Sequence, residues 1–370
     1  MIKVLSIFGT RPEAIKMAPL VKELEKREEI ESVVCVTAQH REMLDQVLEV
    51  FNIKPDYDLN IMKKGQTLSE ITSRVLAGLE DVIKDSNPDI VLVHGDTTTS
   101  FAGALAAFYQ QKDIGHVEAG LRTDNKYSPY PEEMNRQMVD CMTDMYFAPT
   151  DVSKGNLLKE NVDENKIYVT GNTAIDAMAT TVKKDYTHEE LNWLNDDEKL
   201  ILLTAHRREN IGENMENIFT AVKRIVDDMP NVKVIYPIHL NPLVRETAKK
   251  VFKDSEKVKL IEPLDVFDFH NFMDKSYLIM TDSGGIQEEA PSLGKPVLVL
   301  RDTTERPEGI DAGTLKLVGT NENVIYEEAM KLLTDENEYK KMAQAKNPYG
   351  DGHASERIVD AIIEKYKDRI

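Results

Sequence analysis

Acidic residues follow apolar, strand-like segments in the first half of the sequence, where they could handle protons. Asp96 comes shortly after the apolar run 90–94, and Glu118 ends the next such run. Glu132 follows Pro131 at the start of a predicted helix. Each carboxylate alone has a structural interpretation, because acids cap helices and stabilise the first helical turn. All three are predicted at the ligand-facing edge of one sheet, so together they indicate groups for general acid and base catalysis.

The segment 281–308 has the pattern of a nucleotide-phosphate site. It reads TDSGGIQEEAPSLGKPVLVLRDTTERPE, with Ser283–Gly285 between a short apolar strand and a predicted helix. The glycines let the backbone turn tightly, and the first N–H groups of the helix point at the turn, where a diphosphate could accept them. Glu289 could accept hydrogen bonds from ribose hydroxyls, and Arg306 lies on a loop that could approach the same anion. The alternative is an ordinary capped turn of an α/β protein.

Cations at other strand ends could bind the same kind of anion. Arg11 and Lys16 lie in the first two turns of a predicted helix, where the helix dipole disfavours positive charge unless an anion offsets it. His206 ends another strand and is followed by two arginines, beginning with Arg207, which are costly unless solvated or paired. Phe269 lies in a later loop and helix, where its ring could stack on a base or pack in a core.

The scaffold predicted to position these residues is an α/β fold. Apolar, β-branched runs alternate with segments of helical periodicity, which is typical of βαβ units and parallel sheets. The alternation forms two series, so we expect two Rossmann-like, doubly wound domains at 1–168 and 169–353. Residues 354–370 are expected to return as a helix to the first domain. Ligands bind at the carboxyl ends of strands in such folds, so we expect the domains to face each other across a cleft.

Composition excludes several classes of protein. The 370 residues suffice for two domains with separate cores, and a formal net charge of −19 argues against a nucleic-acid surface. No apolar run is long enough to cross a membrane, and the first residues do not form a signal peptide, so we expect a cytoplasmic protein. Cys35 and Cys141 are the only cysteines. Neither a metal-ligand spacing nor a GxGxxG motif occurs, so we expect no metal and no cofactor.

The motifs as a set resemble one known family. They are FGTRPEAIKMAP, HGDTTTS, GHVEAGLRT, SPYPEEMNRQMVD, TGNTAIDA, TAHRREN and the segment 281–308. Together they are similar to the non-hydrolysing UDP-N-acetylglucosamine 2-epimerases over nearly the whole chain. The resemblance implies the two-domain GT-B fold of many sugar-nucleotide glycosyltransferases and the interconversion of UDP-N-acetylglucosamine and UDP-N-acetylmannosamine. It also implies a homodimer with a UDP-sugar substrate and no cofactor.

The resemblance assigns site residues by motif position. The implied catalytic residues are Asp96, Glu118, Glu132 and His206. The implied substrate-binding residues are Arg11, Lys16, Phe269, Ser283, Gly284, Gly285, Glu289 and Arg306, with Phe269 against uracil. One departure is Leu264, which stands where some members carry a polar residue near the base.

The implied chemistry begins with the departure of UDP. The hydrogen at C2 of the sugar is not acidic in the ground state, so its acidity must come from loss of UDP at C1. A carboxylate then removes the C2 proton to give a glycal, and UDP adds back after reprotonation on the other face. Two faces require two proton-handling groups, and the sequence leaves open which of the three acids serves which face.

The resemblance also implies a second nucleotide-sugar site that activates the enzyme. Its candidate residues are Gln39, His40, Glu133, Arg207 and His239. The alternative is that these are ordinary polar groups at strand ends. Other functions could use the same phosphate site, namely a glycosyltransferase of this fold, a hydrolysing epimerase or a non-catalytic sensor. The three acids disfavour the sensor, and the full motif set disfavours the transferase.

Overall fold

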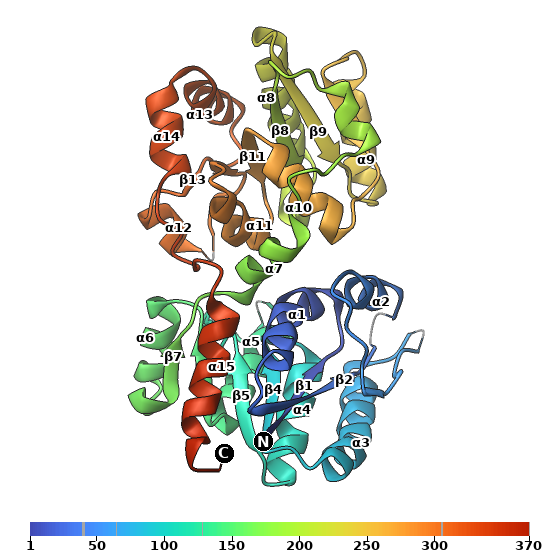
Figure 1. The fold of residues 1–370 in the computed structure, drawn as a ribbon. Helices are drawn as coiled ribbons and strands as arrows, with labels where there is room; N and C mark the ends of the chain where they lie inside the picture. Colours follow the sequence, from blue (N-terminus) through green and yellow to red (C-terminus); the bar gives the residue numbers. More distant parts are fainter. Residues whose placement is uncertain (39–40, 64, 128, 305, 370) are drawn as a thin grey trace. The chain divides into compact units, whose positions relative to one another are not determined.

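The chain divides into two compact units. The computed structural model describes residues 1–38, 41–63, 65–127, 129–304 and 306–369. Unit 1 comprises Met1–Thr180 with Tyr349–Ile370, and unit 2 comprises Thr181–Pro348 (Figure 1). The division lies at the end of helix α7, whereas the sequence pattern placed the boundary before this helix, at 168/169.

Unit 1 is built on a parallel sheet with the strand order β3-β2-β1-β4-β5-β6-β7. Its strands are β1 (Ile2–Phe8), β2 (Ile30–Val36), β3 (Tyr57–Asp58), β4 (Ile90–His94), β5 (Asp113–Val117), β6 (Met145–Ala148) and β7 (Ile167–Val169). The chain reverses its direction of travel across the sheet between β1 and β4, so the order is doubly wound, as predicted. The carboxyl ends of β1, β4 and β5 therefore lie side by side.

Helices connect these strands. They are α1 (Arg11–Glu25), α2 (Arg41–Val50), α3 (Leu68–Ser86), α4 (Thr98–Tyr109), α5 (Glu132–Met142), α6 (Asp151–Lys159) and α7 (Thr173–Thr181). The C-terminal helix α15 (Ala354–Lys365) packs against α1 (Figure 1). Just beyond it, the Tyr366 hydroxyl donates to Asp113 Oδ2 at 2.6 Å. The predicted return of the last helix to the first domain is therefore confirmed.

Unit 2 contains the second parallel sheet, with the strand order β10-β9-β8-β11-β12-β13. Its strands are β8 (Lys199–Thr204), β9 (Val232–Pro237), β10 (Val258–Ile261), β11 (Leu278–Thr281), β12 (Val297–Val299) and β13 (Leu315–Leu317). Its helices are α8 (Glu213–Asp228), α9 (Pro242–Phe252), α10 (Val266–Lys275), α11 (Gly284–Glu289), α12 (Pro307–Asp311), α13 (Glu322–Thr334) and α14 (Glu336–Ala343). The reversal here lies between β8 and β11, whose ends carry His206 and Ser283.

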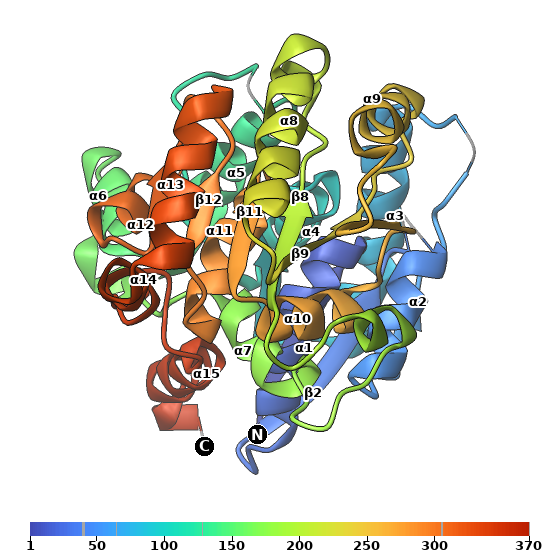
Figure 2. The same cartoon turned by 90° about the horizontal axis from the view of Figure 1, so that it is seen from above.

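Each sheet is buried by its helices. All five residues of β4 are buried, as expected for a central strand covered on both faces. Helix α8 packs on the unit 2 sheet beside β9 (Figure 2). It buries Ile218, Phe219, Val222 and Ile225, which recur at helical spacing. Each such side chain contributes about 1.5–3 kcal/mol by leaving water, so the two cores hold the strand ends in place.

Among the described residues, no helix has the length and apolar character needed to cross a membrane. The same residues contain no group of three His, Cys, Asp or Glu side chains arranged to hold a metal ion.

Candidate active site

The carboxyl edge of the unit 1 sheet is held together by a buried glutamate. Glu13 of α1 is only 2% exposed, and its carboxylate accepts the backbone N–H groups of Gly9 at 3.1 Å and Thr10 at 2.7 Å. The Thr97 hydroxyl, beyond β4, donates to it at 2.7 Å. Burial raises the pKa of Glu13, and these hydrogen bonds oppose that shift. Glu13 thus fixes the loop after β1 against the loop after β4.

Glu118 and Lys16 meet at this edge. Lys16 Nζ forms an ion pair with Glu118 Oε1, and Asn172 Nδ2 donates to the same oxygen at 3.3 Å. The side chains of Lys16 and Glu118 are 19% and 10% exposed, so solvent screens the pair only partly. Within unit 1, the carboxylate of Glu118 therefore provides an anion that offsets the charge of Lys16 near the start of α1.

Asp96 is held by two residues of α5. Arg136 donates to Asp96 Oδ2 at 2.6 Å, and the side-chain amide of Asn135 donates to the Asp96 carbonyl at 2.9 Å. Asp96 is not the N-cap of the following helix, because Thr97 occupies that position and accepts the backbone N–H of Ser100. Its carboxylate remains 27% exposed. Asp96 therefore has an ion-pair role rather than a capping role.

Helix α5 begins with two glutamates in different environments. Glu132 is partly buried, and its carboxylate has no hydrogen bond or ion pair within the described ranges of the chain. Glu133 is fully buried and accepts the backbone N–H groups of Thr123 at 3.1 Å and Asp124 at 3.2 Å. Glu133 therefore braces the loop before α5. Sequence reasoning missed Arg136, although it lies one helical turn after Glu132, where it shares a face with that acid.

A buried network supports the turn that carries Asp96. His116 of β5 contacts Asp140 Oδ1 at 2.6 Å through Nδ1 and the Gly95 carbonyl at 2.7 Å through Nε2. Arg122 donates to the other oxygen of Asp140 at 2.7 Å. Burial alone would raise the pKa of Asp140, but His116 and Arg122 hold it below its ordinary value. The network fixes the backbone at Gly95.

In unit 2, the backbone at His206 is held by a buried aspartate. Asp282, which follows β11, is 0% exposed and accepts the backbone N–H groups of His206 and Arg207, each at 2.8 Å. His206 Nδ1 lies 3.3 Å from Asp282 Oδ1. Burial lowers the pKa of His206, and the negative charge of Asp282 opposes that shift. Sequence reasoning missed Asp282, although an acid directly after a buried strand was the signal used for the acids of the first domain.

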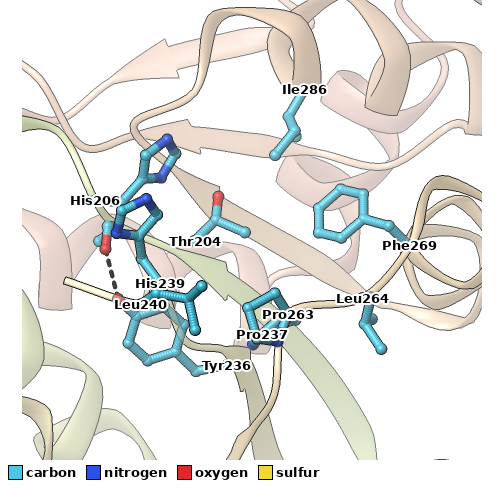
Figure 3. Close-up of a pocket in the computed structure, with 11 residues that line it drawn as sticks. Thr204, His206, Tyr236, Pro237, His239, Leu240, Pro263, Leu264, Phe269 and Ile286 are labelled. Carbon is cyan, nitrogen blue, oxygen red and sulfur yellow. Dashed lines mark hydrogen bonds between the residues drawn. The ribbon is translucent and has the colours of Figure 1, made fainter. Parts of the chain in front are cut away.

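A cavity of about 310 Å³ opens beside His206 (Figure 3). The rings of His206 and His239 stack 5.4 Å apart on one side, and Phe269 and Ile286 lie on the other. The other lining residues are Thr204, Ala205, Tyr236, Pro237, Leu240, Pro263 and Leu264. A mostly apolar cavity with aromatic walls suits a flat heterocycle.

The predicted phosphate site lies on the same sheet edge as this cavity. The Arg306 guanidinium lies against Gly284, because a Cβ added there would be 3.4 Å from Arg306 Cζ. Arg306 also donates to Glu288 at 2.8 Å. A Cβ added at Gly285 would meet no atom within 4 Å, so the backbone is accessible there. The Ser283 N–H is already donated to Thr281 Oγ1 and Gly284 is buried, so the accessible backbone at this turn is that of Gly285.

The remaining predicted residues have varied surroundings. Glu289 Oε2 lies 3.7 Å from Nε2 of the buried His270. Arg11 is partly buried, and no carboxylate pairs with it in the part of the chain that the structure describes. Arg207 donates to the Asp282 carbonyl at 3.1 Å, and His239 is exposed. Gln39 and His40 lie outside the described residues.

A family match and individual relatives of this chain carry the same name. The family described as UDP-N-acetylglucosamine 2-epimerase matches residues 22–363. A protein of Bacillus subtilis (strain 168) named UDP-N-acetylglucosamine 2-epimerase is 67% identical, over 99% of this chain and 96% of its own. The crystal structure of UDP-GlcNAc 2-epimerase from Neisseria meningitidis bound to UDP-GlcNAc is 52% identical, with a TM-score of 0.88 over 98% of this chain and all of the other.

A more distant structure bears on the fold. The glycosyltransferase from Rickettsia africae is only 14% identical but has a TM-score of 0.65 over 99% of both chains. At that identity the likeness shows the fold alone. The chain has the GT-B-like fold of two parallel α/β units that the sequence predicted.

Proposed function

Because the chain belongs to the UDP-N-acetylglucosamine 2-epimerase family, we propose that it interconverts UDP-N-acetylglucosamine and UDP-N-acetylmannosamine without releasing free sugar. The observation that carries the proposal is the carboxyl edge of the unit 1 sheet. There Asp96 and Glu118 are each held by a cation, and α5 presents Glu132, which has no partner among the described residues. A glycosyl-binding protein without chemistry would have no use for these acids.

Unit 2 is proposed to recognise UDP. The aromatic cavity would hold uracil against Phe269, and the carboxylate of Glu289 would accept hydrogen bonds from the ribose. The backbone of the buried Gly284 and of the more accessible Gly285, with Arg306 beside it, would bind the diphosphate. The relative from Neisseria meningitidis is described as bound to UDP-GlcNAc, which supports a UDP-sugar as the ligand.

His206 is proposed to stabilise UDP as it leaves C1. Oδ1 of the buried Asp282 lies 3.3 Å from Nδ1, so its negative charge favours the protonated ring against the opposing effect of burial. A diphosphate would favour that form further, and the imidazolium could then donate a hydrogen bond to the developing negative charge. Asp282 is thus a positioning residue for His206.

The proton transfers at C2 are proposed to use the carboxylates of unit 1. As the bond from C1 to UDP breaks, one carboxylate removes the C2 proton and the electron pair of that C–H bond forms the C1–C2 double bond of the glycal. Another acid then returns a proton to the opposite face, and UDP adds back at C1. The candidates are Asp96, Glu118 and Glu132, with Lys16 and Arg136 placing the first two through ion pairs.

Incubation with UDP-N-acetylglucosamine in D₂O, followed by NMR, tests the proposal. Epimerisation places deuterium at C2 of both nucleotide sugars, because the removed proton exchanges with solvent. Free sugar with UDP would instead indicate a hydrolysing enzyme. The absence of turnover would indicate a sensor or a transferase that requires an acceptor.

We also propose that UDP-N-acetylglucosamine activates the enzyme at a second site that includes Arg207 and His239. Both residues lie at the carboxyl edge of the unit 2 sheet, next to His206. The contacts of Glu133 are internal to unit 1, so they give this residue a bracing role instead. Activation predicts sigmoidal kinetics and little reverse reaction from pure UDP-N-acetylmannosamine. Hyperbolic kinetics in both directions would refute it. The predicted homodimer stays a prediction that sedimentation can check.

A further inference from the structure

His94 has a buried ring nitrogen that no hydrogen bond satisfies. The residue ends β4 and is 4% exposed, and its Nε2 has no hydrogen-bond partner among the described residues. The nearest acidic atom is Oε2 of Glu118, at 3.9 Å, which is too far for a hydrogen bond. Buried polar atoms are nearly always paired, and an exception at a sheet edge that carries acids calls for an explanation.

The protonation state of the His94 ring decides whether Nε2 is a hydrogen-bond donor or an acceptor. Burial lowers the pKa of His94 to about 3, although Glu118 opposes this shift, so the imidazole is neutral and carries one proton. A neutral imidazole has one protonated nitrogen, and a protonated Nε2 would approach the Glu118 carboxylate to hydrogen-bond distance rather than stand 3.9 Å from it. The separation therefore fits a proton on Nδ1 and a lone pair on Nε2.

The contacts of Glu118 are distributed between its two oxygens. Lys16 and Asn172 both contact Oε1, whereas His94 faces Oε2. The other titratable group near His94 is His116 on β5, whose ring nitrogens contact Asp140 and the Gly95 carbonyl. With Glu118 ionised, the lone pair of Nε2 meets a second acceptor, which accounts for their separation. With a proton on Oε2, the same two atoms become a donor and an acceptor.

We propose that His94 is a positioning residue for Glu118, whose protonated carboxyl donates a hydrogen bond from Oε2 to Nε2 during the reaction. The inference rests on the proposed function, in which Glu118 is one of the two proton-handling groups. The proton moves from C2 to Glu118 as the C–H electron pair forms the double bond of the glycal. It remains on Glu118 while the glycal is bound and then exchanges with solvent, and His94 neither gains nor loses a proton. Lys16 keeps its contact with Oε1 throughout.

Replacement of His94 by Phe tests the inference, because Phe retains a ring but removes the acceptor. We expect kcat to fall about tenfold with KM nearly unchanged, as for the loss of one hydrogen bond. Because the protonated form of Glu118 loses its acceptor, the limb of the pH profile that reports Glu118 should move about one unit to lower pH. His94→Gln should partly restore both values, since its amide oxygen can accept the same bond.

Ser6→Ala is the matched control. The Ser6 hydroxyl is also fully buried and without a hydrogen-bond partner in the described chain, and it lies on the neighbouring strand β1. The control should leave kcat and both pH limbs unchanged. A folded His94→Phe protein with the same kcat and pH limbs as the unchanged protein would overturn the inference.

A measurement on the unchanged protein covers the case in which His94→Phe does not fold. In NMR spectra of protein labelled with ¹⁵N-histidine, His94 should show a proton on Nδ1 and none on Nε2. A protonated Nε2 would overturn the inference. Failure of the proposed function is a separate outcome, because the unchanged protein would then make no UDP-N-acetylmannosamine, while the NMR measurement would still report on the ring.

Discussion

Two adjacent glutamates at the start of α5 allow chemistry and structure to be separated by matched substitutions. Glu132 is partly buried and has no hydrogen-bond or ion-pair partner among the described residues. Glu133 is fully buried and accepts several hydrogen bonds. Glu132→Gln and Glu133→Gln each change one carboxylate into an amide of the same size. We expect Glu132→Gln to remove turnover without loss of stability. We expect Glu133→Gln to lower stability and to retain turnover.

The magnitudes follow from the contacts. A general acid or base contributes about 10²–10⁴-fold, so Glu132→Gln should raise the barrier by about 3–5 kcal/mol. The carboxylate of Glu133 accepts N–H groups from Thr123, Asp124 and Gln137, at 3.0–3.2 Å. Hydrogen bonds to a charged group contribute about 1.5–3 kcal/mol each, and the amide retains one acceptor oxygen. Glu133→Gln should therefore cost about 2–4 kcal/mol, which lowers the melting temperature by roughly 5–15 °C.

Both variants are measured in the same two assays. Turnover is followed by NMR of the nucleotide sugars, and unfolding is followed by circular dichroism. Glu133→Gln should keep kcat within about tenfold, because Arg136 retains its own contact with Asp96. Equal losses of turnover in the two variants, or a fully active Glu132→Gln protein, would refute the assignment of Glu132.

Other predictions concern the nucleotide site and pH. Arg306→Ala and Glu289→Ala should each weaken UDP binding in calorimetry, and an unchanged Kd would show that the site is misplaced. Gly285→Ala should fold normally, since its Cβ meets no atom within 4 Å, yet bind UDP at least about tenfold more weakly. Between pH 6.5 and 5 the unfolded chain protonates His94 and the folded chain does not, so stability should fall as the pH falls, by up to about 1.4 kcal/mol per unit. In urea titrations, the free energy of unfolding of His94→Phe should fall less steeply as the pH is lowered.

The sequence predicted the main strands and the fold, because long apolar runs carry a clear periodicity. It did not predict β3, β7 and β13, since two or three residues at a sheet edge have no measurable period. Asp96 and Glu118 both follow strands of the first sheet. The predicted α/β fold was therefore enough to place them at the same sheet edge. The topology does not supply the ion pair of Glu118 with Lys16, whose positions are 102 residues apart.

The missed residues share one property, which is that their role depends on a partner distant in sequence. Asp282 stands within the segment 281–308, but its contact with His206 joins positions 76 residues apart. A sequence pattern marks Asp282 only as an acid before a turn. For the same reason the pattern suggested Asp96 as a helix cap, whereas the structure gives that role to Thr97.

The number of hydrogen bonds to a carboxylate separates structural acids from acids that can exchange protons. Glu13 and Glu133 accept several donors while buried, so protonating either would break bonds that hold loops in place. Glu132 has no such constraint among the described residues. In its described contacts Glu118 is intermediate, because Lys16 and Asn172 contact one oxygen and His94 faces the other. A proton on the second oxygen would keep the ion pair and satisfy His94, so the surroundings of Glu118 fit both of its protonation states.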